Sequence, residues 1–140
     1  MKWVTWENIG VDRMGCAWLI RRFVDPAAEF VFVAPGTNPI PEGVVPFDIP
    51  GTHLSHHDGH SSFHTIVREY GLDDPILRRI AQMVDEADVT QEVMVEPAAQ
   101  GLDLICRGLR LTSPDDAVAL ERGGLIYDAL YAQLTADPSS

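Results

Sequence analysis

The sequence predicts an α+β domain, with a small β-sheet and an early helix first and a mostly helical C-terminal half after them. Two observations carry this prediction. The alternating, β-prone segments all lie before residue 50, whereas segments with a helical apolar period and Ser, Asp or Pro start signals fill residues 61–136. The 140 residues, 46% of them apolar, suffice for one hydrophobic core. We therefore expect a single domain over residues 1–140.

Local signals place the first elements. Residues 2–6 alternate and are rich in β-formers, and residues 29–33 (Glu-Phe-Val-Phe-Val) are the clearest strand. Between them, Asp12 is the expected N-cap of a helix over residues 13–23, which Asp25-Pro26 ends. Four prolines and two glycines make residues 34–46 an irregular loop, and a brief strand is expected over residues 47–49.

Four helices are expected in the second half. Ser61 or Ser62 caps the first and Asp73 or Asp74 the second, which has Pro75 at its first position. Residues 87–96 are acidic and irregular. Gly123-Gly124 marks a break or a close-packing point in the last helix. The expected ranges are 61–70, 75–86, 97–111 and 114–136.

Composition excludes several classes of function. The net charge is −11, with one lysine and nine arginines against 21 acids, so binding of nucleic acid by this chain alone, or of an anionic membrane surface, is disfavoured. The sequence contains no uncharged apolar run of about 18 residues, which is the length that a membrane-spanning helix needs. The N-terminus resembles no signal peptide, and we expect a cytoplasmic protein.

All five histidines lie within residues 53–64. Imidazoles crowded together repel one another when protonated, which favours a neutral, metal-binding state over the alternative of a solvated polar loop. Asp58-Gly59 interrupts any continuous helix, so an HExxH site is not expected. The ligands would be His53, His56 or His57 from the loop and His64 from the following helix, completed by a carboxylate at Asp48, Asp58, Asp85, Asp88 or Glu96.

Imidazole with carboxylate suits Zn, Mn, Fe, Co or Ni, and no cysteine of a structural zinc site lies in this window. A second group, Arg13, Arg21 and Arg22 around Cys16, gives an acidic chain a local positive region that can face a small oxyanion. The alternatives are a basic pair that binds neighbouring acids such as Asp25 or Glu29 and a cysteine that is a buried hydrophobe.

Motifs spread over nearly the whole chain resemble the chromate-resistance (ChrB-type) domain family. Each motif alone is weak, but the ordered set is specific. The matching segments are Asp12-Arg13 through Cys16-Ala-Trp18 to Asp25-Pro26, Phe30-Val-Phe32, Pro46-Phe-Asp48-Ile-Pro-Gly51, His56 with Ser62-Phe63, Tyr70-Gly-Leu-Asp-Asp-Pro75, Ala87-Asp88 and Tyr127-Asp-Ala-Leu-Tyr131.

In longer members this domain is the C-terminal part of a chromate-responsive regulator. The resemblance implies that His56 and Asp88 are the first metal ligands, followed by His53 and His64, which stand where many members have glutamate. Other departures are Ala17 in the usual Cys-Pro-Trp motif, Ser61 in place of cysteine, and Asp85-Glu86 in place of a His-Asp pair. The missing cysteine weakens a thiol-based reduction mechanism.

The first hypothesis is a cytoplasmic metal-binding domain in stress response, for resistance to or sensing of chromate or heavy metals. His53, His56, His64 and Asp88 would hold a divalent transition metal, and Arg13, Arg21 and Cys16 would face a small oxyanion. Two alternatives remain open, a metal-dependent oxidoreductase or hydrolase with Asp58 or a histidine as base, and a metal-free interaction module. The partners would be a metal ion or small oxyanion and a second copy in a homo-oligomer, not nucleic acid or membrane.

Overall fold

Three parallel strands and a connecting helix make the N-terminal half of the domain. The computed structural model describes residues 1–140, and its sheet has the order β2-β1-β3, with β1 (Lys2–Trp6) between β2 (Glu29–Val33) and β3 (Val45–Pro46). Both pairings of β1 are parallel. The chain passes from β1 to β2 through helix α1 (Val11–Leu19), which continues as the π-helical turn η1 (Ile20–Val24). The predicted α+β class, with a small sheet and an early helix, is confirmed.

Two predicted positions in this half need correction. The brief strand lies at Val45–Pro46 and not at 47–49, because Asp48 has a φ of 50° and the chain turns away from the sheet there. Asp12 is not an N-cap, since Gly10 occupies the cap position and Asp12 lies in the first turn of α1. Its carboxylate is therefore free to bind elsewhere.

Four helices follow, close to their predicted ranges. They are α2 (Ser62–Glu69), α3 (Pro75–Asp88), α4 (Ala98–Thr112) and α5 (Asp116–Ala136). Side chains of Ser61, Asp74 and Asp115 cap α2, α3 and α5 by accepting backbone N–H bonds. Helix α3 runs two residues beyond its predicted end at Glu86, which places Asp88 in its last turn. No helix is long and apolar enough to cross a membrane.

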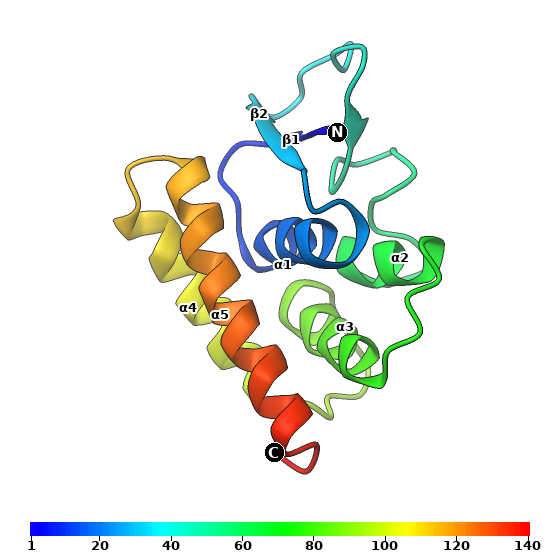
Figure 1. Ribbon diagram of the computed structural model, residues 1–140, viewed down its shortest axis with the longest axis vertical. Helices are drawn as coiled ribbons and strands as arrows, with labels where there is room; N and C mark the ends of the chain where they lie inside the picture. The colour runs from blue at the N-terminus through cyan, green and yellow to red at the C-terminus, as the bar shows by residue number, and fades with distance from the viewer.

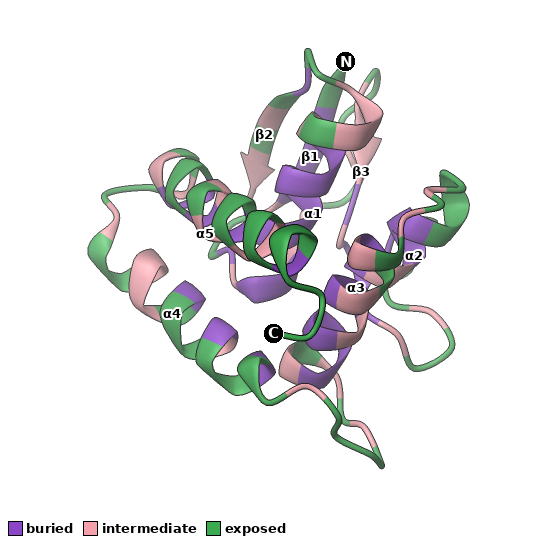
Figure 2. Cartoon of the chain, turned by 60° about the horizontal axis from the view of Figure 1, so that its bottom comes forward, coloured by how far each residue is buried: buried purple, intermediate pink, exposed green.

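Helix α1 lies at the centre of the molecule, with the α2–α3 pair on one side and the α4–α5 pair on the other (Figure 1). Eight of its nine residues are buried, because packed elements surround it on both sides (Figure 2). Trp18 stacks on Phe63 of α2 and on Tyr127 of α5, so it is a core residue. The first turn of α1 lies next to the histidine segment, where Asp12 contacts His56.

Candidate metal centre

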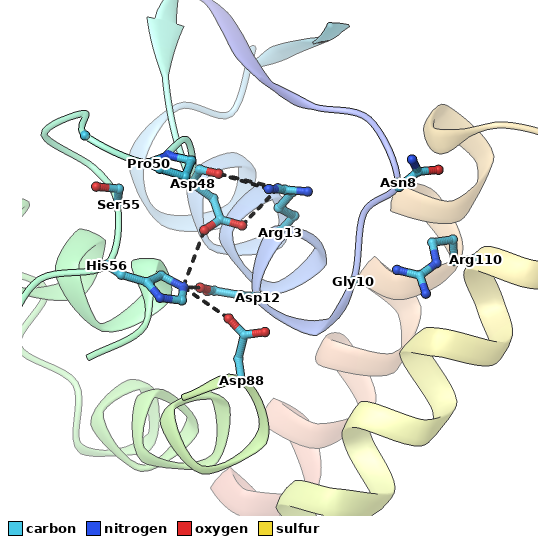
Figure 3. A pocket seen from close by; sticks show the side chains of 11 residues that line it. Asn8, Gly10, Asp12, Arg13, Asp48, Pro50, Ser55, His56, Asp88 and Arg110 are labelled. Carbon is cyan, nitrogen blue, oxygen red and sulfur yellow. Dashed lines mark hydrogen bonds and ion pairs between the residues drawn. The ribbon is translucent and has the colours of Figure 1, made fainter. Parts of the chain in front are cut away.

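A polar cavity of about 500 Å³ lies where the first turn of α1, the turn after β3, the histidine segment and the end of α3 meet (Figure 3). None of its lining residues is hydrophobic. They are Asn8, Gly10, Asp12, Arg13, Asp48, Pro50, Gly51, Ser55, His56, Asp88 and Arg110. A cavity of this size and polarity suits an ion with a small ligand better than an apolar molecule.

Asp12 is fixed in this cavity by the start of a different helix. Its side chain is almost fully buried, and it accepts the backbone N–H groups of Ser62 and Phe63 at 2.8 and 2.9 Å. Free N–H groups and the helix dipole favour a negative charge at this position. The Asp12 carboxylate thus caps α2 while one edge of Oδ2 stays available to the cavity.

His56 directs Nε2 at three carboxylates (Figure 3). The distances are 2.9 Å to Oδ2 of Asp12, 3.1 Å to Oδ2 of Asp88 and 3.7 Å to Oδ1 of Asp48. The contacts with Asp12 and Asp88 raise the pKa of His56 to about 10, although partial burial opposes the shift. Without a metal ion, the His56 imidazolium therefore supplies the positive charge that these carboxylates need.

Opposing effects also act on the pKa of Asp48, which lines the same cavity. Burial and the neighbouring Asp12 raise the pKa of Asp48 above its usual value, while Arg13, with Nε 3.0 Å from Oδ2, and a 2.6 Å hydrogen bond from Ser62 Oγ lower it. Arg13 also donates to the backbone oxygen of Asp48. The guanidinium is thus directed into the cluster of acids and not toward a free anion.

The spacing of these side-chain atoms fits a metal ion. Ligand atoms about 2.1 Å from an ion lie about 3.0–3.4 Å from one another in octahedral or tetrahedral geometry. The distances from His56 Nε2 to Asp12 and Asp88 fall in or near this range, and that to Asp48 is slightly longer. An ion at the centre would take the place of the proton on Nε2. The candidate ligands are His56, Asp12 and Asp48, whose ligand atoms all lie within 4.8 Å of one another. Asp88 adds a fourth carboxylate beside His56 Nε2.

Comparison with known proteins assigns the family. Residues 3–134 match the family described as "ChrB, C-terminal domain". The chain is also 34% identical over 136 residues to Protein ChrB of Cupriavidus metallidurans (strain CH34). The chain belongs to the ChrB C-terminal domain family. It spans about two fifths of that relative's length, since the alignment covers 96% of this chain and 41% of the relative. No solved structure matches it.

The resemblance seen in the sequence is therefore confirmed, and this ChrB C-terminal domain has two of its four expected metal ligands in contact. His56 and Asp88 meet in the cavity. His53 is 76% exposed and lies 3.1 Å from Glu69, away from His56. His64 joins a different cluster with His60 and Asp85. The four residues that the sequence groups into one site thus lie in three separate places in the fold.

The expected anion-facing residues are also separated in this ChrB C-terminal domain. Arg13 lines the cavity, but Arg21 pairs with Glu121 of α5 at 2.7 Å. Cys16 is fully buried, and its Sγ lies 3.4 Å from Oδ1 of Asp12. Burial and the nearby carboxylates raise the pKa of the Cys16 thiol well above its usual value, which disfavours the reactive thiolate.

Other sequence candidates lie outside the cavity. The Asp58 side chain is 83% exposed and lies 3.7 Å from Arg68, and Glu96 pairs with Arg79. Arg21 and Arg22 pair with acids, as one of the alternatives expects, but the acids are Glu121 and Asp128 of α5 and not Asp25 or Glu29. Asp25 accepts from Trp3 and the N-terminus instead.

The sequence does not predict two of the charged residues of this cavity as site residues. Asp12 was interpreted only as a helix cap, and no local signal shows that its carboxylate reaches a helix 50 residues further on. Arg110 of α4 lines the cavity opposite His56, and its side chain alone among those of the nine arginines has neither an ion pair nor a hydrogen bond (Figure 3). Its role depends entirely on how α4 packs, so the sequence gives no indication of it.

Proposed function

We propose that this ChrB C-terminal domain binds a divalent transition-metal ion, one of Zn, Mn, Fe, Co or Ni, through His56, Asp12 and Asp48, with Asp88 as a fourth group. The observation that supports this proposal most strongly is the convergence of three carboxylates on one imidazole nitrogen at 2.9–3.7 Å in a polar cavity. The Asp12 and Asp48 carboxylates have ligand atoms within 4.8 Å of each other and repel when both are charged, and a divalent cation relieves that repulsion better than one proton does.

The residues around these ligands support the same assignment. Asp12 is oriented by two backbone N–H groups and Asp48 by Ser62 and Arg13, so the carboxylates are held in place before an ion arrives. One imidazole with several carboxylates is a harder donor set than a histidine-only site. This donor set favours Mn²⁺ or Fe²⁺ over Cu²⁺.

The biological role that we propose is the sensing of, or resistance to, chromate or another toxic metal species in the cytoplasm. The support is the family resemblance together with the metal-ligating cavity. Binding or loss of the ion would affect helices α1 and α2 together, because Asp12 in α1 caps α2 and also faces the site.

The test is calorimetric titration of chelator-treated protein with Mn²⁺ and with Zn²⁺. His56→Gln and Asp88→Asn each remove one ligand with little change of shape, and we expect each to weaken binding by more than about tenfold, the lower end of what even an outer-shell substitution costs. Asp103→Asn is the matched control, since Asp103 lies on α4 and pairs with Arg107. Equal affinities in wild type, His56→Gln and Asp88→Asn would contradict the proposal.

A second function, metal-dependent catalysis on a small anionic substrate, is favoured by one observation. Arg110 and Asn8 lie across the cavity from His56, and the Arg110 guanidinium is unpaired (Figure 3). An anion held there would lie within the same polar space as the metal ligands. If so, Arg110→Gln lowers the affinity of the metal-loaded protein for small oxyanions without lowering its affinity for the metal. Unchanged oxyanion affinity would contradict this alternative.

A further inference from the structure

A second cluster of side chains of metal-ligand type lies next to the α2 N-terminus. Oδ2 of Asp85, in α3, lies 2.7 Å from Nδ1 of His60 and 3.2 Å from Nδ1 of His64. The two imidazole rings stack with centroids 3.8 Å apart and planes inclined by 16°. Helices α2 and α3 lie side by side here (Figure 1), so the three side chains come from the α2 start and the neighbouring helix.

The Asp85 carboxylate is oriented in the way that bound metal ligands usually are. Its Oδ1 accepts the Ser61 backbone N–H at 2.8 Å and the Ser61 hydroxyl at 2.7 Å, and the residue is fully buried. Oδ1 is therefore saturated by Ser61, and Oδ2 alone faces the imidazoles. Outer hydrogen bonds of this kind fix the free oxygen of a metal-binding carboxylate.

The cap of α2 does not require His60 or His64. Ser61 and Asp85 complete the cap without them, yet both Nδ1 atoms lie within 3.2 Å of one carboxylate oxygen. The buried Nδ1 of His64 lies 3.2 Å from that oxygen and has no hydrogen-bond partner. A buried polar nitrogen without a partner is costly, and a bound cation would satisfy it.

We propose that His60, His64 and Asp85 form a second metal site, selective for Zn²⁺, Ni²⁺ or Co²⁺. Two imidazole nitrogens and one carboxylate oxygen are a donor set typical of these ions and leave coordination positions open. A groove beside His60, lined by Gly59, Gln82 and Glu92 among others, gives water or a small ligand access to those positions.

This second site does not depend on the site at His56. Two separate buried aspartates serve the two sites, Asp12 capping α2 at Ser62 and Phe63, and Asp85 at Ser61. No ligand is shared between the clusters. The donor sets also differ, since the first has one imidazole with up to three carboxylates, and the second has two imidazoles with one carboxylate. The two sites should therefore prefer different ions.

The test is titration of the chelator-treated chain with Co²⁺, followed by ligand-field absorption and by equilibrium dialysis. Three proteins are compared with wild type, namely His60→Ala/His64→Ala, His56→Gln and, as the exposed-histidine control, His53→Ala. We expect two equivalents of Co²⁺ in wild type and in His53→Ala, and one in each of the other two. Asp85 is left intact because its removal would also remove the cap of α2.

The His56→Gln protein isolates the second site for spectroscopy. X-ray absorption of its bound Co²⁺ should show two imidazole ligands, and the single variant His60→Asn should reduce that number to one if the double variant does not fold. Loss of one equivalent in His60→Ala/His64→Ala but not in His56→Gln supports the second site and contradicts the function proposed above. Unchanged stoichiometry in a folded His60→Ala/His64→Ala protein, or fewer than two imidazoles in the His56→Gln spectrum, overturns the inference.

Discussion

At the scale of single residues, the charge on His56 links the chemistry of the cavity to the stability of the domain. The raised pKa of His56, about 10, means that the folded domain holds this proton more tightly than the unfolded chain, whose imidazole has the ordinary pKa of about 6.5. Stabilisation by the protonated ring is complete below about pH 6.5 and is lost as the pH rises through about 10. Asp48 acts in the same direction, because its raised pKa favours the protonated acid in the folded state.

The first prediction follows from these signs. In the presence of a chelator, the free energy of unfolding should fall steadily between pH 6.5 and pH 10, as measured by urea denaturation. Added Mn²⁺ should stabilise the domain more at pH 8 than at pH 6.5, because the ion then competes less with the proton on His56. A free energy of unfolding that stays level or rises over this interval without metal would contradict the assignment of His56.

At the scale of helices, two neighbouring glycines of α5 differ in how closely other atoms pack against them. A Cβ atom at Gly123 would lie 2.8 Å from Sδ and 3.0 Å from Cβ of the buried Met14 in α1, whereas at Gly124 nothing lies within 4 Å. The sequence left open a break or a close-packing point here. Helix α5 is continuous through both positions, so Gly123 is a close-packing point that allows α5 to approach α1.

The second prediction uses this pair as its own control. Gly123→Ala should destabilise the domain by about 1–3 kcal/mol, the usual cost of overpacking a core. Gly124→Ala should instead stabilise it by about 0.5–1 kcal/mol, because alanine is the better helix former. Chemical denaturation of the two variants measures both effects, and equal changes in the two would contradict the packing of α5 on α1.

Elements were predictable where the signal is local. The strands at 2–6 and 29–33 and the helix starts after Ser61 and Asp74 follow from side-chain alternation and capping, which need only a few neighbouring residues. The strand at Val45–Pro46 contains a proline within a proline-rich segment, and the positive φ of Asp48 is a tertiary feature, so this strand was misplaced.

The candidate site was predictable only in its residue types. The histidine cluster and Asp88 pointed to metal ligation, but sequence spacing does not show which histidine faces which acid. Asp12 and His56 are 44 residues apart, and His60 and Asp85 are 25 apart, so their contacts depend on how α1, α2 and α3 pack. That packing separated His53, His56 and His64, which the sequence had grouped together.

At the scale of the whole molecule, the charge of −11 limits what the chain can bind. Its arginines are almost all paired with acids or bonded to backbone oxygens, and Arg110, which is not, lies in the cavity rather than in a basic surface patch. The third prediction is that this chain alone does not bind duplex DNA at physiological salt, because its net charge is −11 and it has few unpaired cationic side chains to replace phosphate counterions. Fluorescence anisotropy checks this, and micromolar affinity that weakens steeply with salt would contradict it.

The measurement that tests the central claim most directly is the metal content of the domain purified without a histidine tag, compared with that of the double variant His56→Ala/Asp88→Ala. After dialysis against a mixture of Zn²⁺, Mn²⁺, Fe²⁺, Co²⁺ and Ni²⁺, we expect the variant to hold one equivalent less than wild type, with circular dichroism showing both folded. Equal metal content in the two proteins, or a wild type that holds no metal, would contradict the claim that the acids around His56 form a metal centre.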